Sequence, residues 1–195
     1  VSELNPTSAT VHYKIAEVLA KGTKEEDIQK AAQSIELALK YEKKNKYFYL
    51  LASNIYASLG QFENATNALE TMMKEVKGTE DYLFELAALY LYDKREDEAL
   101  KVYNRAEDIM GVNEVSSQQK QRIYLDKGKI PEAIAEGEKL LQAYPDEERY
   151  VLGFAETLSI NGQRSKAIQY LEIFIKDHPE AGNAKMVLAG FYKDD

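Results

Sequence analysis

The chain has 195 residues, no cysteine and a formal net charge of −8. This acidic balance argues against nucleic-acid binding, because affinity for phosphate depends on clustered Lys and Arg side chains. The lack of cysteine excludes disulfides and thiolate metal sites. An apolar content of 45% is enough for a packed core, and no apolar run approaches the roughly 20 residues that a spanning helix needs. We expect no membrane insertion by this segment.

The first predicted helices cover residues 13–20 and 31–38. Ala31, Ile35 and Ala38 recur at the spacing of one helical face. The acidic run 25–27 lies where carboxylates favour the positive end of a helix dipole, and the lysine-rich run 40–46 lies at a helix C-terminus, where cations are stabilised. We interpret both runs as solvated helix ends rather than as metal or anion sites.

Residues 47–76 predict two helices joined by a short turn. Tyr49, Ala52 and Tyr56 follow one helical face. Gly60 then breaks the helix, and a second pattern begins at Phe62. A connection of about three residues is too short for anything but an antiparallel hairpin. Two short helices cannot bury such faces alone, so neighbouring hairpins must stack.

The same pattern recurs every 34 residues along the chain. In the second helix of each unit, one position is always alanine: Ala65, Ala99, Ala133 and Ala167. In the first helix, one position that is predicted to lie in the core carries a large side chain: Tyr56, Tyr90, Tyr124, Leu158 and Tyr192. The turn glycine recurs as Gly60, Gly128 and Gly162, with Lys94 in its place once. Pro145 and Pro179 are predicted to stop second helices, and Gly111 to stop another. Such a period indicates stacked repeat units.

The stretches 52–65 and 154–167, with Pro179, resemble the tetratricopeptide repeat family. The resemblance implies an all-α, right-handed superhelical solenoid of about five antiparallel helix hairpins plus a terminal helix. The predicted units are approximately 9–45, 46–79, 80–113, 114–147, 148–181 and a partial unit 182–195, forming one array over residues 1–195. Some bacterial repeat proteins with this pattern are exported.

The first unit fits the common register only if three residues are inserted in the turn Lys21–Asp27. Pro6 then falls where a preceding repeat would end, and the chain stops after Tyr192, about where the first helix of a sixth unit ends. We expect an excerpt of a longer array. The alternative is an N-terminal extension with a capping helix.

The fourth unit departs most from the pattern. Lys120 and Gln121 occupy close-packing positions, and Gly137 lies inside the second helix, at a cost of about 1 kcal/mol against Ala. This predicts a soft point or changed curvature between Gly111 and Lys127. The alternative is that the aliphatic parts of the long Lys and Gln side chains cover the contact between the two helices, with their polar ends in solvent.

The sequence offers no catalytic or cofactor-binding motif. His12 and His178 lack ligand partners at helical spacing, and there is no glycine-rich phosphate loop. We therefore predict a protein that is not an enzyme and needs no cofactor or metal.

In the resembled family, exposed residues of successive first helices bind a partner segment in a concave groove. Apolar patches and aromatic anchors are typical of such surfaces. Position by position, the resemblance implies these groove residues: Tyr47, Leu50, Asn54, Phe84, Ala88, Tyr92, Gln118, Arg122 and Glu156. Tyr47 and Tyr92 are expected to be exposed, whereas leucines such as Leu50 could instead complete the packing between repeats.

Some family members bind a C-terminal carboxylate with two Lys, two Asn and an Arg from successive units. The five positions can be aligned on three different sets of successive units in this chain. Only Asn54 and Arg149 match the required residue types, and they do so in different alignments. We expect no carboxylate clamp, and an apolar or mildly basic partner segment.

The leading prediction is a non-catalytic scaffold that binds a protein or peptide partner. The alternative is a structural spacer or self-association module in a longer repeat protein. The compartment stays open between the cytoplasm and the cell envelope.

Overall fold

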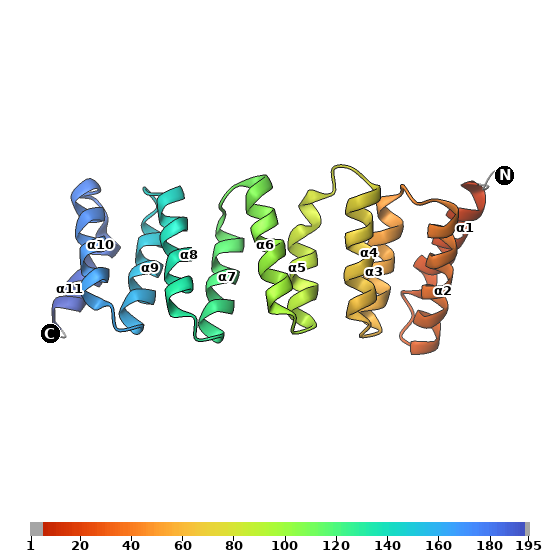
Figure 1. Cartoon of the computed structure of the whole chain (residues 1–195), viewed down its shortest axis with the longest axis horizontal. Helices are drawn as coiled ribbons and strands as arrows, with labels where there is room; N and C mark the ends of the chain where they lie inside the picture. Colours follow the sequence, from red (N-terminus) through yellow and green to blue (C-terminus); the bar gives the residue numbers. More distant parts are fainter. Residues whose placement is uncertain (1–5, 194–195) are drawn as a thin grey trace. The chain divides into compact units, whose positions relative to one another are not determined.

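The structure is a computed structural model that describes residues 6–193. Over that range it is all-α, without strands. The helices are α1 (Pro6–Leu19), α2 (Glu25–Tyr41), α3 (Lys46–Ser58), α4 (Phe62–Glu75), α5 (Leu83–Tyr92), α6 (Glu96–Met110), α7 (Glu114–Asp126), α8 (Ile130–Ala143), α9 (Glu148–Ile160), α10 (Arg164–Asp177) and α11 (Gly182–Lys193), with a short 3-10 helix η1 (Glu80–Tyr82) before α5. Consecutive helices form hairpins (Figure 1).

The tight turns inside the hairpins confirm the predicted role of the repeated glycine. Gly60, Gly128 and Gly162 have φ of 69°, 68° and 75°, in the left-handed region that glycine adopts without strain. Lys94, which replaces glycine in the turn between α5 and α6, has φ of 58°. It is the one non-glycine residue with positive φ among residues 6–193, so the repeat imposes this conformation even where the side chain opposes it.

The predicted helix stops are also found where the sequence places them. Pro145 and Pro179 follow the ends of α8 and α10, and Gly111 follows α6 with φ of 82°. The irregular first turn is shorter than predicted, since α1 ends at Leu19 and α2 begins at Glu25. Residues 25–27 therefore belong to the first turn of α2, where their carboxylates favour the helix dipole.

The chain divides into two compact units, unit 1 up to Ala106 and unit 2 from Glu107 onward. In unit 1, α1 packs on α2, α3 on α4, and α2 and α4 contact the helices that follow them. The buried residues between α1, α2 and α3 are small or aliphatic apart from one aromatic ring: Ala9, Ala16, Ala31, Ile35, Ala38, Phe48, Ala52 and Ile55. Small residues let the helix backbones approach closely, as the sequence predicts.

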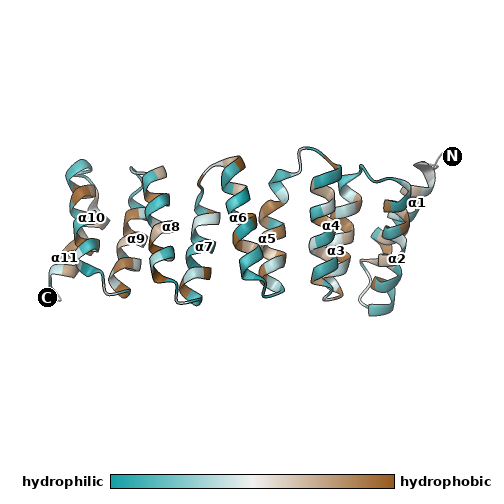
Figure 2. Cartoon of the chain, viewed as in Figure 1, coloured by the Kyte–Doolittle hydropathy of each residue, from teal (hydrophilic) through white to brown (hydrophobic). Residues whose placement is uncertain are grey.

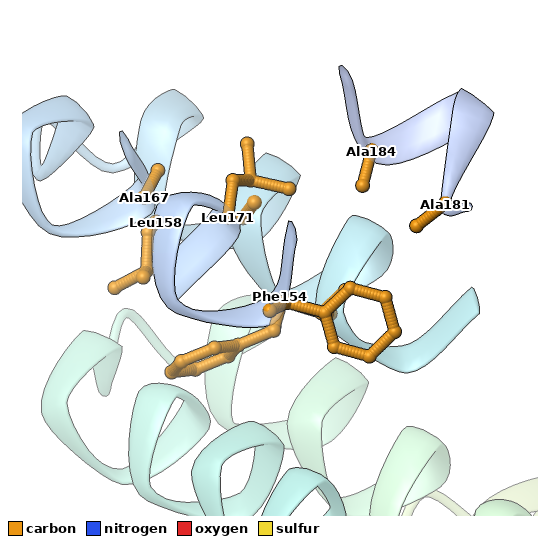
Figure 3. Close-up of a cluster of buried hydrophobic side chains, with 9 residues drawn as sticks. Phe154, Leu158, Ala167, Leu171, Ala181 and Ala184 are labelled. Atoms are coloured by element: carbon orange, nitrogen blue, oxygen red, sulfur yellow. The ribbon is translucent and has the colours of Figure 1, made fainter. Parts of the chain in front are cut away.

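In unit 2, α7 packs on α8, α9 on α10, and α11 lies against both α9 and α10. The core of α9 to α11 contains Val151, Phe154, Ala155, Leu158, Ala167, Leu171, Phe174, Ala181 and Ala184. Figure 3 shows two members of this cluster, Ala181 just before α11 and Ala184 in its first turn. The apolar residues of each hairpin alternate with hydrophilic ones along the ribbons (Figure 2). Within residues 6–193, no helix is long and apolar enough to cross a membrane.

Several tyrosines of the predicted core register are less buried than expected, although Leu158 of the same register is completely buried. Tyr90 is buried, and Tyr56 and Tyr124 are half-buried. Tyr192 was predicted to be in the core but is 52% exposed, because among the described residues α11 is the last helix and only α9 and α10 pack against it. Its hydroxyl donates to Glu172 Oε1 at 2.6 Å.

Candidate partner-binding surface

Helix α3 presents three of the predicted groove residues. Asn45 caps the helix by accepting a hydrogen bond from the backbone N–H of Tyr47. The buried face of α3 leaves Tyr47 59% exposed, Asn54 exposed and Leu50 half-buried. The prediction that Tyr47 is exposed is confirmed, whereas Leu50 divides its surface between solvent and packing.

A lysine joins the beginnings of two first helices in unit 1. Lys46 Nζ lies 5.4 Å from the ring centroid of Tyr47 and 5.7 Å from that of Tyr82, which precedes α5. Both distances are within the range of cation–π attraction. The ring of Tyr47 is therefore held beside a positive charge while much of its surface stays open to solvent.

Helix α5 carries Phe84, Ala88 and Tyr92 at a spacing of four residues, on one helical face. Tyr92 is 73% exposed, and its ring stacks on Phe62 with centroids 6.3 Å apart and planes 13° apart. Phe84 is half-buried, with its centroid 6.4 Å from that of Tyr103. Tyr92 is thus open as predicted, while Phe84 contributes to intramolecular packing.

A small pocket of about 240 Å³ in unit 1 includes Asn54 in its lining. Its other lining residues come from the end of α1, the turn after it, α2 and α3, and they include Glu17, Lys21, Leu51 and Ser58. The carboxamide of Asn54 can both donate and accept hydrogen bonds. The pocket therefore offers a backbone-binding group between the first helices of adjacent hairpins.

Glu85 on α5 has an unusual environment for an exposed carboxylate. Desolvation by surrounding protein atoms raises the pKa of Glu85 although its side chain is solvent-accessible. Desolvation disfavours the ionised form of this carboxyl, and a cation placed beside it would counteract that effect.

Three predicted residues belong to unit 2, and all three are exposed and polar. Gln118 donates to Glu114 Oε1 one turn earlier at 3.0 Å, and Arg122 Nε lies 4.0 Å from Asp126 Oδ2. Glu156 is exposed on α9. Exposed pairs of this kind contribute little to stability, so these side chains could rearrange for a partner at low cost.

Sequence reasoning missed a buried charge cluster in unit 2. Lys120 is completely buried, with Nζ 2.7 Å from Glu107 Oε2 and 2.8 Å from Glu136 Oε2. Lys139 Nζ lies 2.7 Å from the same Glu107 oxygen and 3.0 Å from Glu136 Oε2. The hydroxyl of Ser116 donates to Glu107 Oε1 at 2.6 Å.

Two members of the cluster, Glu107 and Lys139, have pKa values shifted in favour of their charged forms. Burial opposes ionisation of Glu107, but hydrogen bonds from Lys120, Lys139 and Ser116 outweigh it and lower the pKa of this carboxyl. For Lys139, burial opposes the charge, but the hydrogen bonds that its ammonium group donates, first that to Glu107, raise the pKa above its usual value. The suggestion that long side chains merely cover the contact between the helices is therefore wrong for Lys120, whose ammonium group is buried and paired.

Two hydrogen bonds at equivalent positions of different repeats were also missed. The hydroxyl of Tyr56 donates to Glu36 Oε1 at 2.6 Å, and Tyr192 donates to Glu172 in the same way. Each acceptor precedes its tyrosine by 20 residues. The acceptor register is visible in the sequence at the 34-residue step: Glu36, Glu70, Asn104, Glu138 and Glu172. This signal could have been found by following polar as well as apolar residues.

The histidines have structural surroundings. His12 stacks on Tyr41 with centroids 5.8 Å apart, and His178 stacks on Phe174 at 4.4 Å. Among the described residues, no group of three or more His, Cys, Asp or Glu side chains is placed to hold a metal ion.

Comparison with known proteins identifies the fold. No protein-family model matches the sequence, and no curated protein matches it. The crystal structure of MamA matches with a TM-score of 0.59 at 16% identity, covering 90% of this chain and 94% of that chain. YrrB, described as a TPR protein with an unusual peptide-binding site, matches with a TM-score of 0.54 at 18% identity, covering 91% and 92%. This chain has the tetratricopeptide repeat fold.

A tetratricopeptide repeat protein from Parabacteroides merdae gives a similar result, with a TM-score of 0.54 at 17% identity over 88% of this chain and 66% of that chain. The tetratricopeptide repeat fold accounts for the 34-residue period and for the glycine turns inside the hairpins. At these identities the likeness concerns the fold.

Proposed function

We propose that the chain is a non-catalytic scaffold that binds an extended segment of a partner protein through the first helices of unit 1. The observation that carries this proposal is the exposure of two large aromatic side chains, Tyr47 and Tyr92, on first helices. Tyrosine combines a large apolar surface with a polar group and is enriched among residues that dominate binding energy.

The neighbouring groups suit an extended segment. Asn54 is exposed at the small pocket beside α1 and can hydrogen-bond to a partner's backbone. Glu85 is an exposed carboxyl group on α5 that can pair with a cation on the partner. YrrB is described as having a peptide-binding site, and the same use of the fold is proposed here. A carboxylate clamp is not part of the proposal, because the Lys, Asn and Arg set is missing from the sequence.

The proposal is tested by selecting peptides from a displayed random library against the whole chain. The affinity of the selected peptides is then measured by fluorescence anisotropy with Tyr92→Ala, Asn54→Ala and the control Leu37→Ala. Leu37 is an exposed apolar residue on the second helix α2. We expect Tyr92→Ala to weaken binding by about tenfold or more, with only a small decrease in melting temperature from the lost stacking on Phe62, and no effect of the control on binding. Selected peptides that bind all variants equally would refute this site.

A second candidate function, self-association, is favoured by an apolar face on α1. Val11, Ile15 and Val18 are all exposed on this helix, and such a face is typical of an interaction surface. Sedimentation velocity over a concentration series tests it. Self-association through α1 predicts a concentration-dependent increase in mass that Val18→Ser reduces, whereas a monomer at all concentrations would exclude it.

A further inference from the structure

Unit 2 contains a pocket that lies away from the predicted groove residues. Its volume is about 280 Å³, and its walls come mainly from the second helices α8 and α10 and the segment after α8. The apolar lining comprises Leu141, Pro145, Val151, Tyr170, Ile173 and Phe174. This volume falls just below the roughly 300–1,000 Å³ of typical small-molecule sites, so it suits one or two apolar side chains.

The aromatic wall of this pocket is held in place from two sides. The Tyr170 hydroxyl donates to Glu138 Oε1 at 2.5 Å, and the Tyr170 ring meets Phe154 edge-on with centroids 4.9 Å apart. The hydrogen bond to Glu138, together with burial, raises the pKa of Tyr170 to about 12, so the hydroxyl stays protonated and able to donate even in moderately alkaline solution. A fixed wall lowers the ordering cost of binding.

Ile173 leaves an apolar edge of the pocket in water. This side chain is 61% exposed although it belongs to the pocket lining. Covering it removes apolar surface from water, which favours binding before the costs of association are counted. Unit 2 therefore exposes an apolar side chain to solvent at the edge of a preformed pocket.

The charged residues around the pocket have one sign. Glu138, Asp146 and Asp177 belong to the lining, which contains no Lys or Arg. His178 completes this side of the pocket, with Nε2 3.3 Å from Asp146 Oδ1 and Nδ1 3.7 Å from Glu180 Oε1. Such a rim repels nucleic acid and anionic lipid headgroups and attracts cations.

We infer that this pocket binds a protein segment in which a large apolar side chain is flanked by Lys or Arg residues. The apolar side chain enters between α8 and α10 and covers Ile173, while the flanking cations lie against Asp146 and Asp177. A second copy of this chain, with its net charge of −8, suits such a rim less well than a basic partner. This site is additional to the proposed first-helix surface, so the two can be tested separately.

The test uses the whole chain with isotope-labelled isoleucine methyl groups and the synthetic peptide KKLFKK as probe. We expect saturable changes in the Ile173 methyl signal and an affinity that falls as salt is raised, because exposed charges are screened. The matched peptides EELFEE and KKGGKK separate the two parts of the proposal. Both should bind at least about tenfold more weakly, the first for lack of cations and the second for lack of an apolar anchor.

Variants locate the site. Ile173→Arg should remove binding of KKLFKK, and Asp146→Asn combined with Asp177→Asn should weaken it several-fold. Ile160→Arg is the matched control, because Ile160 is similarly exposed but lies on α9 and outside the pocket lining. Equal binding of KKLFKK and EELFEE, or loss of binding in Ile160→Arg with retention in Ile173→Arg, would overturn the proposal. Neither result bears on Tyr92, so the proposed function is tested independently.

Discussion

The hairpins α3–α4 and α7–α8 occupy the same repeat register but bury opposite kinds of side chain. Ala52 on α3 corresponds to Lys120 on α7, and both are completely buried. Leu69 on α4 corresponds to Gly137 on α8, and both are buried. Apolar contacts close the first hairpin. In the second, buried apolar residues such as Ile123 and Leu140 are accompanied by the ion pairs of Lys120 with Glu136 on α8 and with Glu107 on the preceding helix α6. The repeat therefore fixes a backbone spacing, which apolar or ionic side chains can fill.

The missing side chain at Gly137 is compensated by the large ring of Phe154 on α9. At Gly137 an added Cβ would lie 2.7 Å from Phe154 Cδ2 and 3.1 Å from Phe154 Cε2. The ring of Phe154 thus occupies the space in which other repeats carry a larger residue. Gly137 is therefore not only a weak helix former, as the sequence suggests, but the residue that admits this ring.

The largest expected effect is breaking the charge cluster. Lys120→Ala leaves the carboxylates of Glu107 and Glu136 buried with fewer cations, and removing one partner of a buried pair costs about 3–5 kcal/mol. Urea unfolding followed by circular dichroism measures the free energy of unfolding. The control is Arg122→Ala, which removes an exposed pair worth less than about 1 kcal/mol. If both variants lose the same small amount, the cluster adds nothing beyond a surface pair.

A more moderate loss is expected for Gly137→Ala. The better helix propensity of Ala gains about 1 kcal/mol, but the clash with Phe154 costs typically 1–3 kcal/mol, so a net loss is expected. Gly153→Ala on α9 is the matched control, since an added Cβ there meets nothing within 4 Å, and it should be stabilising. Phe154→Leu in the Gly137→Ala background should recover part of the loss. A stabilising Gly137→Ala would show that Phe154 moves freely.

The charge cluster should make the free energy of unfolding depend on pH, which the apolar contacts of α3 and α4 do not. The folded-state pKa of Glu107 is lowered, so its contribution is present above the unfolded pKa near 4.5 and is lost as pH falls through the folded value. The pKa of Lys139 is raised, so its contribution is present below about 10.5 and is lost as pH rises through the folded value.

Thermal melts from pH 3 to pH 12 of the chain and of Lys120→Met measure this difference. We expect the parent chain to lose more stability than the variant at acid pH, because the variant has already lost the Lys120 contribution to the low pKa of Glu107. Parallel pH profiles of the two proteins would contradict the assigned role of the cluster.

The smallest expected change in stability concerns the turn inside each hairpin, which has the same conformation in α3–α4 and in α7–α8. Gly60 and Gly128 have nearly the same φ. Lys94→Gly in the turn between α5 and α6 should stabilise by about 0.5–1 kcal/mol, because it removes left-handed strain at the expense of some chain entropy. Gly60→Ala should destabilise by a similar amount, since an added Cβ there meets no neighbour and only the backbone strain changes. A destabilising Lys94→Gly would mean that the lysine side chain contributes more than the strain costs.

Much of the fold follows from the sequence because its determinants are local and periodic. Turn glycines, prolines after helices and apolar residues at helical spacing act within a few residues of themselves. The exposure of Tyr47 and Tyr92 was predicted because their positions are fixed by phase within the repeat. The burial of Phe84 was not, because its packing partner Tyr103 lies on another helix.

Local patterns in the sequence are enough to predict the helix hairpins, their 34-residue period and the position of their turns, whereas the left-handed conformation of Lys94 is a finding of the structure. The packing of helices against one another shows that Lys120 is an ion-paired core residue and that Gly137 accommodates Phe154. It also shows the acidic-rimmed pocket between α8 and α10. The physical reason is distance along the chain, since the partners in these contacts come from different helices. Whether a buried charge is tolerated depends on what those helices place beside it.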